Sequence, residues 1–252
     1  MEGILRVRLG LAALAGLGWL YLVYMAWGMM HMDLPAAQWL MPAMMNWGSG
    51  DLVLVWLMWA VMMVAMMLPS ALPMVQMYAR VANNQAAQDG GSLLSAFVGG
   101  YLLVWAGFSL AVTLAQWGLL ELRLVTPMME SASQWLSGLL LLGAGVYQFT
   151  SFKQLCLNKC RTPLGFLLGE WRPGTRGAFL MGLHHGAYCV GCCAMLMLLL
   201  FVLGVMNLIW IAVLTLVVLV EKVLPAEQEW PSRLLGIGLI AWGGFLMIGI
   251  QV

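Results

Sequence analysis

The amino-acid sequence predicts an all-α protein, a polytopic bundle of about seven transmembrane helices, and two observations support this prediction. Of the 252 residues, 63% are hydrophobic and only 8% are charged, and the mean hydropathy of +0.93 is far above that of soluble domains. The apolar residues also form long runs, and about 20 helical residues cross a hydrocarbon layer of roughly 30 Å. Helices are expected because each one satisfies its own backbone hydrogen bonds in lipid.

Seven apolar runs are candidate spans. The sixth is short and is separated from the fifth only by MNL, which predicts a tight helical hairpin. The first lacks a small-x-small cleavage site before its end, so we expect it to be retained as a helix. The expected spans are Leu9–Met30, Leu52–Leu72, Ala96–Leu119, Trp135–Ser151, Ala178–Met206, Leu208–Val220 and Leu234–Val252. No repeat or low-complexity segment divides them, so residues 1–252 are expected to form a single integral membrane domain.

The basic residues predict the orientation of the bundle. With the N-terminus inside, only Arg123 of the 11 Lys and Arg residues falls in an outer segment. The inner basic residues are Arg6, Arg8, Arg80, Lys153, Lys159, Arg161, Arg172, Arg176, Lys222 and Arg233. This asymmetry predicts an N-in/C-out, multi-pass membrane protein, which in a bacterium would lie in the cell inner membrane with its outer side facing the periplasm. The net charge of +1 gives no indication of nucleic-acid binding.

Two histidines and three cysteines interrupt the fifth span, in the segment GLHHGAYCVGCCAMLM. His185, Cys189 and Cys193 are spaced i, i+4, i+8 and share a helix face, with Cys192 beside them and His184 preceding them. A polar ring inside a span is costly and is by default a functional hypothesis. A buried cysteine, in contrast, also behaves as a small hydrophobic residue, so each thiol alone is compatible with packing. The small-xxx-small pair Gly182 and Gly186 predicts close approach of a neighbouring helix.

The second span carries a ladder of methionines. Met58, Met62 and Met66 form one i+4 row, and Met63 and Met67 form the next. Methionine often fills gaps in apolar cores, so this pattern alone would indicate packing. Pro69 and Pro73 follow and are expected to break or kink the helix.

Together, the thioethers, thiols and imidazoles indicate a site for a soft metal ion. Cu(I) prefers thiolate and thioether donors, and one thiolate with neutral Met and His donors cancels its charge. Zn(II) would need two thiolates and binds Met poorly, so copper is favoured over zinc. The candidate ligands in the bilayer are His185, Cys189, Cys192, Cys193, His184, Met62, Met66, Met63 and Met58.

Soft donors also lie on both sides of this expected core. The outer segments contain Met29, Met30, His31, Met32, Met41, Met44 and Met45. On the inner side, Cys156 and Cys160 form a C-x3-C pair, which could equally be two ordinary thiols. The neighbouring Lys153, Lys159 and Arg161 are expected to lower the pKa of these thiols. Donors that change from thioethers outside to thiols inside favour inward passage of Cu(I).

Three sequence blocks resemble a bacterial family described only as predicted metal-binding integral membrane proteins of unknown function. The blocks are MWAVMMVAMMLPSALPMVQMY, QLCLNKCRTPLGF, and MGLHHGAYCVGCCAMLM with the later MNLIWIAVL and EKVLP. They cover about Met58 to Pro225. The resemblance implies metal binding and leaves transport, sensing and delivery open. The lipid bilayer, the metal ion and a metal chaperone or another membrane protein are the expected partners.

Two other classes of function remain open. Cys189 and Cys192 form a C-x-x-C pair, as in thiol-disulfide oxidoreductases, although midway burial would keep a protein substrate away. A structural or assembly subunit of a membrane complex would use the same polar residues for helix packing. Enzymatic acid–base chemistry is not favoured, because the glutamates fall in loops or at helix ends and Glu221 is expected to pair with Lys222 at the interface. The absence of a phosphate-binding loop after a strand excludes an ATP-driven pump within this chain.

Overall fold

The computed structural model describes residues 2–31, 33–34, 47–85, 90–124, 133–225 and 228–248. Within these ranges the chain is helical with short connections, and no strand occurs, which confirms the all-α prediction. The helices are α1 (Glu2–Met30), α3 (Ser49–Gln85), α4 (Gly90–Glu121), α5 (Gln134–Tyr147), α6 (Ser151–Arg161), α7 (Pro163–Glu170), α8 (Gly174–Leu198), α9 (Leu200–Leu203), α10 (Leu208–Val223) and α11 (Trp230–Met247).

Four segments of the described chain are long and apolar enough to cross a membrane. They are Leu9–Met30, Ser49–Ala82, Gly90–Glu121 and Gly174–Leu203, which correspond to four of the seven expected spans. The other three expected spans correspond to α5, α10 and α11, which fall short of this combination of length and hydropathy. With 14 residues, α5 is about 21 Å long.

Local capping explains where several helices begin and end. Thr150 caps α6 by accepting a hydrogen bond from the backbone N–H of Lys153, so the expected fourth span ends before Ser151. After α9, Gly204 adopts a φ of 89°, which favours glycine, and the Asn207 side chain caps α10. This confirms the tight connection between the fifth and sixth spans. Helix α3 continues through Pro69 and Pro73, so the prolines do not end it.

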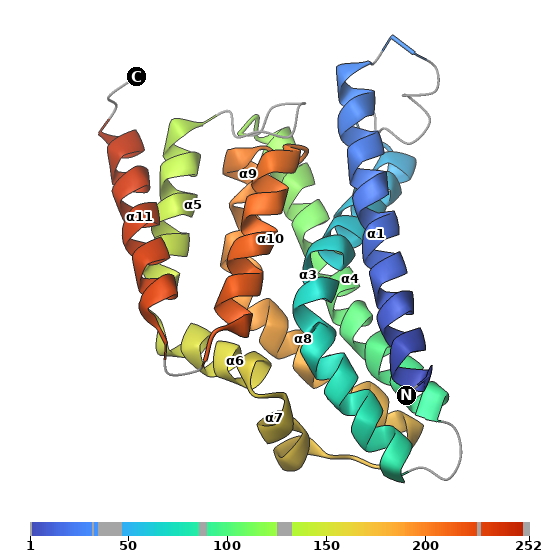
Figure 1. Ribbon diagram of the computed structural model, residues 1–252. Coiled ribbons are helices and arrows are strands. Elements are labelled where there is room, and N and C mark those ends of the chain that lie inside the picture. Colours follow the sequence, from blue (N-terminus) through green and yellow to red (C-terminus); the bar gives the residue numbers. More distant parts are fainter. Residues whose placement is uncertain are drawn as a thin grey trace.

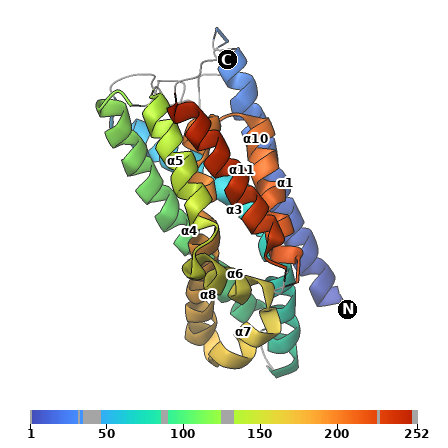
Figure 2. The same ribbon diagram turned by 90° about the vertical axis from the view of Figure 1, so that its left-hand side faces the viewer.

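The long helices run side by side. Figures 1 and 2 show α1, α3, α4, α5, α8, α10 and α11 extended along one axis, with the short helices α6 and α7 at one end. The start of α1 and the end of α11 lie at opposite ends of the bundle. Helix α8 packs mainly against α4 and α6, α3 packs against α1 and α4, and α5 packs against α11.

Glycines permit the closest helix contact. A Cβ atom on Gly182 of α8 would collide with the backbone of Phe97 in α4, and one on Gly100 would collide with the backbone of Phe179. A Cβ on Gly186 would press against Val104. The small-xxx-small pair therefore has the close neighbour that the sequence predicts, and this neighbour is α4.

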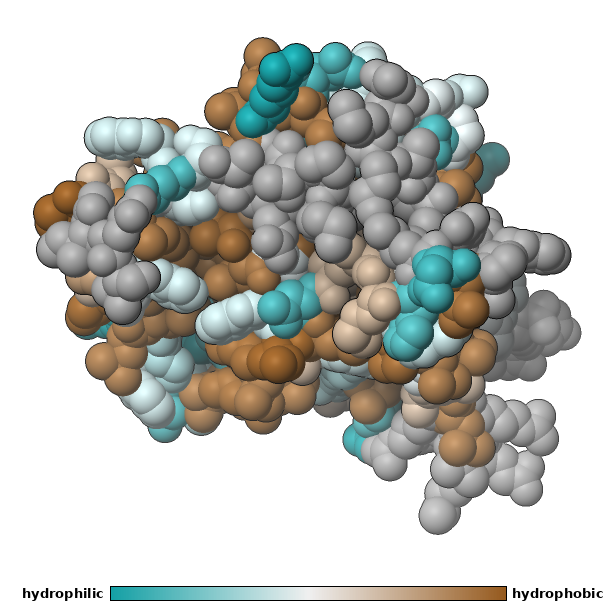
Figure 3. Space-filling model, turned by 90° about the horizontal axis from the view of Figure 1, so that it is seen from above, coloured by the Kyte–Doolittle hydropathy of each residue, from teal (hydrophilic) through white to brown (hydrophobic). Residues whose placement is uncertain are grey.

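The outer surface of the bundle is apolar. Leucine, isoleucine, valine and tryptophan side chains are exposed along α1, α4, α5, α10 and α11. In Figure 3, which looks onto one end of the bundle, hydrophobic residues predominate on the coloured surface. Exposed apolar side chains over several helices are typical of a surface that contacts lipid, and they agree with the four spanning-length segments.

Candidate metal centre

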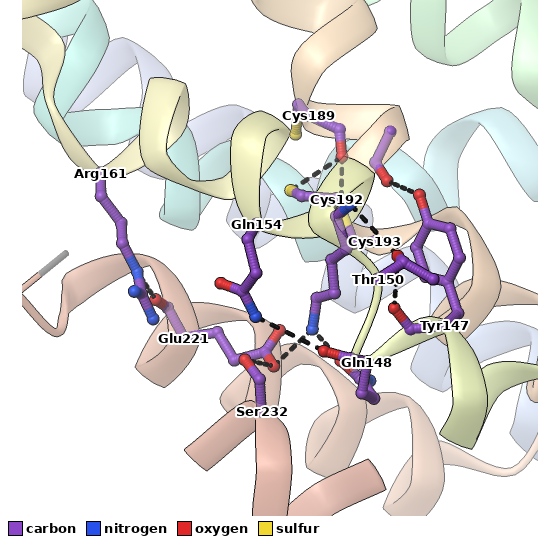
Figure 4. Close-up of polar contacts among 12 residues, drawn as sticks. Tyr147, Gln148, Thr150, Gln154, Arg161, Cys189, Cys192, Cys193, Glu221 and Ser232 are labelled. Atoms are coloured by element: carbon purple, nitrogen blue, oxygen red, sulfur yellow. Dashed lines mark hydrogen bonds and ion pairs between the residues drawn. The ribbon is translucent and has the colours of Figure 1, made fainter. Parts of the chain in front are cut away.

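The three cysteines of α8 lie together in the core. Cys189, Cys192 and Cys193 are each 1% exposed. The Sγ atoms of Cys192 and Cys193 are 3.7 Å apart, and both thiols donate to the carbonyl oxygen of Cys189, at 3.1 and 2.7 Å. The thiol of Cys189 lies on the same turn of α8 as the other two. Figure 4 shows this group, in which one turn of a helix gathers three thiols.

A thioether from α3 completes a cluster of sulfur atoms. The Sδ atom of Met67 is 3.9 Å from the Sγ atom of Cys193. The candidate methionines of the sequence all lie in the same hydrophobic core as the thiols: Met58, Met62, Met63 and Met66. We name Cys189, Cys192, Cys193 and Met67 the sulfur cluster. Met67 belongs to the predicted ladder but was not among the candidate ligands, because the spacing alone does not fix the register between two helices.

A buried lysine and two hydroxyl groups surround Cys189. The Nζ atom of Lys222, near the end of α10, lies 3.0 Å from the Sγ atom of Cys189 and 2.9 Å from the Oγ atom of Ser70. The hydroxyl group of Tyr101 lies 3.2 Å from the same Sγ atom. All four side chains are buried. Polar groups from α3, α4 and α10 therefore converge on one thiol of α8.

A second buried polar network fixes α6 against α10 and α11. The Nζ atom of Lys153 lies 2.6 Å from the Oε1 atom of Glu221 and also donates to the Oε1 atom of Gln148. The hydroxyl group of Ser232 donates to the same Glu221 oxygen at 2.6 Å, and Arg161 Nε donates to the Glu221 backbone oxygen at 2.6 Å. Figure 4 shows this network, which holds α6 in place, and α6 in turn packs against α8, the helix of the three cysteines.

These contacts correct the expected roles of three charged residues. The sequence predicted an interfacial ion pair between Glu221 and Lys222, but adjacent residues on a helix do not face each other. In the structure Glu221 pairs with Lys153, and Lys222 contacts Cys189. Both lysines are buried, whereas the positive-inside count treated them as loop charges. The signal available in the sequence was their position near or within apolar segments, where a lysine needs a partner.

The two α6 thiols are placed differently. Cys160 is half-buried, and its thiol contacts the thiols of Cys189 and Cys192. Cys156 is buried against the backbone of Gly191, where an added Cβ atom would collide with its Sγ atom. Of the C-x3-C pair, Cys160 therefore extends the sulfur cluster towards the surface of the bundle.

The expected lowering of the pKa of these α6 thiols is wrong. Burial raises the pKa of Cys156, because a thiolate loses hydration there. The pKa of Cys160 is raised well above its ordinary value, chiefly because hydrogen bonding with the thiols of Cys189 and Cys192 favours its protonated form, and burial adds to this effect. Helix α6 lies outside the four spanning-length segments. At these two thiols, burial and hydrogen bonding raise the pKa by more than the nearby positive charges lower it.

His185 lies in an aromatic cage next to the sulfur cluster. Its ring stacks near Phe97 and Tyr101, with centroids 6.1 and 5.7 Å away, and meets Phe166 edge-on at 5.4 Å. The residue is 3% exposed, and its Nδ1 atom has no hydrogen-bond partner in the described chain. Tyr101 contacts both His185 and Cys189, so one aromatic ring connects the imidazole with the thiols.

His184 faces away from the sulfur cluster. Its Nδ1 atom lies 2.6 Å from the Oε2 atom of Glu170 in α7, and its side chain is 43% exposed. Tyr188 donates to the other Glu170 oxygen at 3.3 Å. The hydrogen bond from His184 is the main reason why the pKa of Glu170 is lowered. His184 therefore joins α8 to α7.

Soft donors also lie at the other end of α1. Met29 and Met30 line a surface pocket together with Met206 and the start of α10. The Nδ1 atom of His31 lies 3.0 Å from the backbone oxygen of Trp27. The remaining outer donors of the sequence, Met32, Met41, Met44 and Met45, lie outside the described residues.

The chemistry of the centre is that of sulfur donors. Within the described ranges, no three or more His, Cys, Asp or Glu side chains are arranged as a ready-made metal site. A soft ion would instead use thiols together with the Met67 thioether, and soft sulfur donors of this kind favour thiophilic ions such as Cu(I). The centre thus defines a class of protein: a helical protein with segments long and apolar enough to span a membrane and a buried cluster of soft donor atoms.

The comparison with protein families agrees with this class. Residues 56–246 match the PpoB2 family, described as a copper chaperone. Because the match covers most of the chain, the protein belongs to this family, and the family name connects it with copper. The matched range includes the whole sulfur cluster, both α6 thiols and Lys222. The match supports a copper-related family, whereas the membrane-protein part of the predicted resemblance is not tested by it. No curated protein and no solved structure matches the chain.

Proposed function

We propose that the protein is a membrane-embedded copper-handling protein that binds Cu(I) at the sulfur cluster and passes it to a partner protein. The observation that carries this proposal is that the buried thiol of Cys193 contacts both the thiol of Cys192 and the thioether of Met67, at sulfur–sulfur distances of 3.7 and 3.9 Å, with Cys189 on the same helix turn. With metal–sulfur bonds of about 2.3 Å, the ligands of a trigonal site are about 4 Å apart. The cluster therefore needs little rearrangement to hold an ion.

The other candidate ligands differ in how well they are placed to bind an ion at the sulfur cluster. The Nδ1 atom of His185 has no hydrogen-bond partner in the described part of the chain, and Cys160 is a thiol in contact with the centre. Met58, Met62, Met63 and Met66 supply further thioethers in the same core. Cys156 and His184 are less suitable ligands, because the Cys156 thiol faces Gly191 and the His184 ring is paired with Glu170.

We further propose that the bundle crosses the bacterial inner membrane seven times, with its N-terminus inside and its C-terminus outside. The shorter helices α5, α10 and α11 run beside the four longer ones, and the ends of the chain's described part lie on opposite sides (Figure 1). An odd number of crossings requires such an arrangement. The methionine pocket at the end of α1 and the half-buried Cys160 on α6 lie at opposite ends, as entry and exit points for inward passage would.

Burial favours metal handling over thiol-disulfide exchange. Cys189 and Cys192 are each 1% exposed, so a protein disulfide cannot reach them without rearrangement of the bundle. A thioether, moreover, takes no part in disulfide chemistry, whereas it is a suitable neutral ligand for Cu(I).

Copper analysis of the purified protein tests this proposal. After anaerobic reconstitution with Cu(I) and removal of excess ion, the parent should retain copper, whereas Cys189→Ala/Cys193→Ala should fold and lose it. Cys156→Ala is the matched control, because it removes a buried thiol that faces Gly191, and it should retain copper. Equal copper content in the parent and the double variant would exclude the cluster as the binding site.

A further inference from the structure

Lys222 brings a positive charge to the sulfur cluster. Its Nζ atom lies 3.0 Å from the Sγ atom of Cys189, and its only other hydrogen-bond partner in the described chain is the hydroxyl group of Ser70. The neighbouring carboxylate, Glu221, is bonded to Lys153 instead. Lys222 is 8% exposed, and an ammonium group in such surroundings is strongly destabilising unless an anion balances it. The group in contact with Lys222 that can carry a negative charge is the thiol of Cys189, as a thiolate.

We propose that Lys222 is the counterion of a bis-thiolate copper centre and thereby determines how many thiolates bind the ion. This inference rests on the proposed function and specifies its ligand set. Cu(I) with two thiolates carries a charge of −1, which the ammonium group of Lys222 neutralises. Cu(I) with one thiolate and neutral Met or His donors is already neutral, so Lys222 would leave a buried positive charge.

The geometry assigns the two thiolates. Cys189 is the thiol that Lys222 contacts, and the thiol of Cys193 contacts the backbone oxygen of Cys189 at 2.7 Å and the thioether of Met67 at 3.9 Å. Cys193 is therefore the second thiolate, and Met67 is the neutral third donor. Lys222 does not bind the metal. It is a positioning residue, which acts through its charge on Cys189.

A double-mutant cycle tests the charge argument. Cu(I) affinity is measured by anaerobic competition with a chelator for the parent, Cys193→Ser, Lys222→Met and the double variant. With Lys222 present, Cys193→Ser leaves a net positive centre, and affinity should fall by at least about tenfold. With Lys222→Met, the same loss of a thiolate restores neutrality, so Cys193→Ser should cost much less or should increase affinity.

Two further variants separate charge from packing. Lys222→Arg keeps the charge and should keep the full penalty for Cys193→Ser. Lys222→Gln removes the charge but retains a polar group next to Ser70, and it replaces Lys222→Met in the cycle if that protein does not fold. Equal penalties with and without the charge would overturn the counterion role while leaving the copper site intact. Failure of the parent to bind Cu(I) would instead overturn the proposed function, and this inference with it.

Discussion

Two lysines, Lys153 and Lys222, are buried in this bundle, and their partners give them different roles. Lys153 is paired with a carboxylate that also accepts from Ser232, so its charge is balanced permanently. Lys222 faces a thiol and a hydroxyl group, and a soft metal ion would compete for the same thiol. Removal of the partner of a buried charge is strongly destabilising, so a fixed pair constrains how the helices pack. A buried charge whose partner is also a metal ligand instead contributes to the charge balance of the bound ion.

The largest expected effect comes from the fixed pair. Glu221→Gln leaves Lys153 buried without an anion and should destabilise the protein by about 3–5 kcal/mol, measured as a lower thermal unfolding midpoint in detergent. Glu229→Gln is the matched control, because Glu229 pairs with Arg233 at the surface, and it should cost less than about 1 kcal/mol. Similar midpoints for the two variants would show that the Glu221 network does not hold α6 in place.

The next effect concerns the thioether of the cluster. Met67→Leu keeps the volume and apolarity of the side chain, so the free energy of unfolding should change by less than about 1.5 kcal/mol. The Cu(I) affinity, in contrast, should fall by about tenfold because a thioether ligand is lost. Met74→Leu, a buried methionine of the same helix in a different core cluster, should change neither quantity. Met62→Leu/Met66→Leu tests the rest of the ladder in the same assay. If Met67→Leu binds Cu(I) as the parent does, Met67 serves packing alone.

A smaller effect is expected at the caged imidazole. His185→Phe keeps an aromatic ring among Phe97, Tyr101 and Phe166 and removes a buried nitrogen that has no partner in the described chain. Leaving such an atom unsatisfied costs about 1–3 kcal/mol, so the variant should be at least as stable as the parent. Copper affinity should fall by less than in Met67→Leu. A less stable variant with unchanged copper affinity would assign His185 a packing role.

The smallest effect is expected at His184. Its hydrogen bond lowers the pKa of Glu170, so the pair contributes stability above the unfolded-state pKa of this carboxyl group. The contribution is lost as pH falls through the lowered, folded-state pKa. His184→Ala should therefore raise the pKa of Glu170 and reduce stability near neutral pH by less than about 1 kcal/mol, because the pair is partly exposed. A large loss of copper in this variant would contradict the placement of His184 outside the centre.

Periodicity was sufficient to predict the helices and one face of the site. The i, i+4, i+8 spacing of His185, Cys189 and Cys193 predicts a single stripe, and the structure buries all three on α8. The pair of small residues Gly182 and Gly186 likewise predicts the close approach of another helix. These features depend only on the local geometry of one helix, which the sequence determines directly.

Contacts between helices could not be read from spacing. Nothing in the sequence places Lys222 of α10 against Cys189 of α8, because the rotation and register of two helices follow from the packing of the whole bundle. For the same reason, the sequence did not show that His185 is buried whereas His184 is partly exposed. It also did not show that Met67, of all the methionines in the ladder, contacts Cys193. Lys222 lies near the end of an apolar run, so it resembled a loop charge.

The ligand environment of bound copper tests the central claim most directly. X-ray absorption of the anaerobically loaded protein reports which atoms surround the ion and at what distance. We expect Cu(I) with a shell dominated by sulfur at about 2.3 Å, a typical metal–sulfur distance, and we expect Cys189→Ala/Cys193→Ala to lose this signal. A shell of nitrogen or oxygen, or a sulfur shell unchanged in the double variant, would contradict the assignment of the sulfur cluster as the copper site.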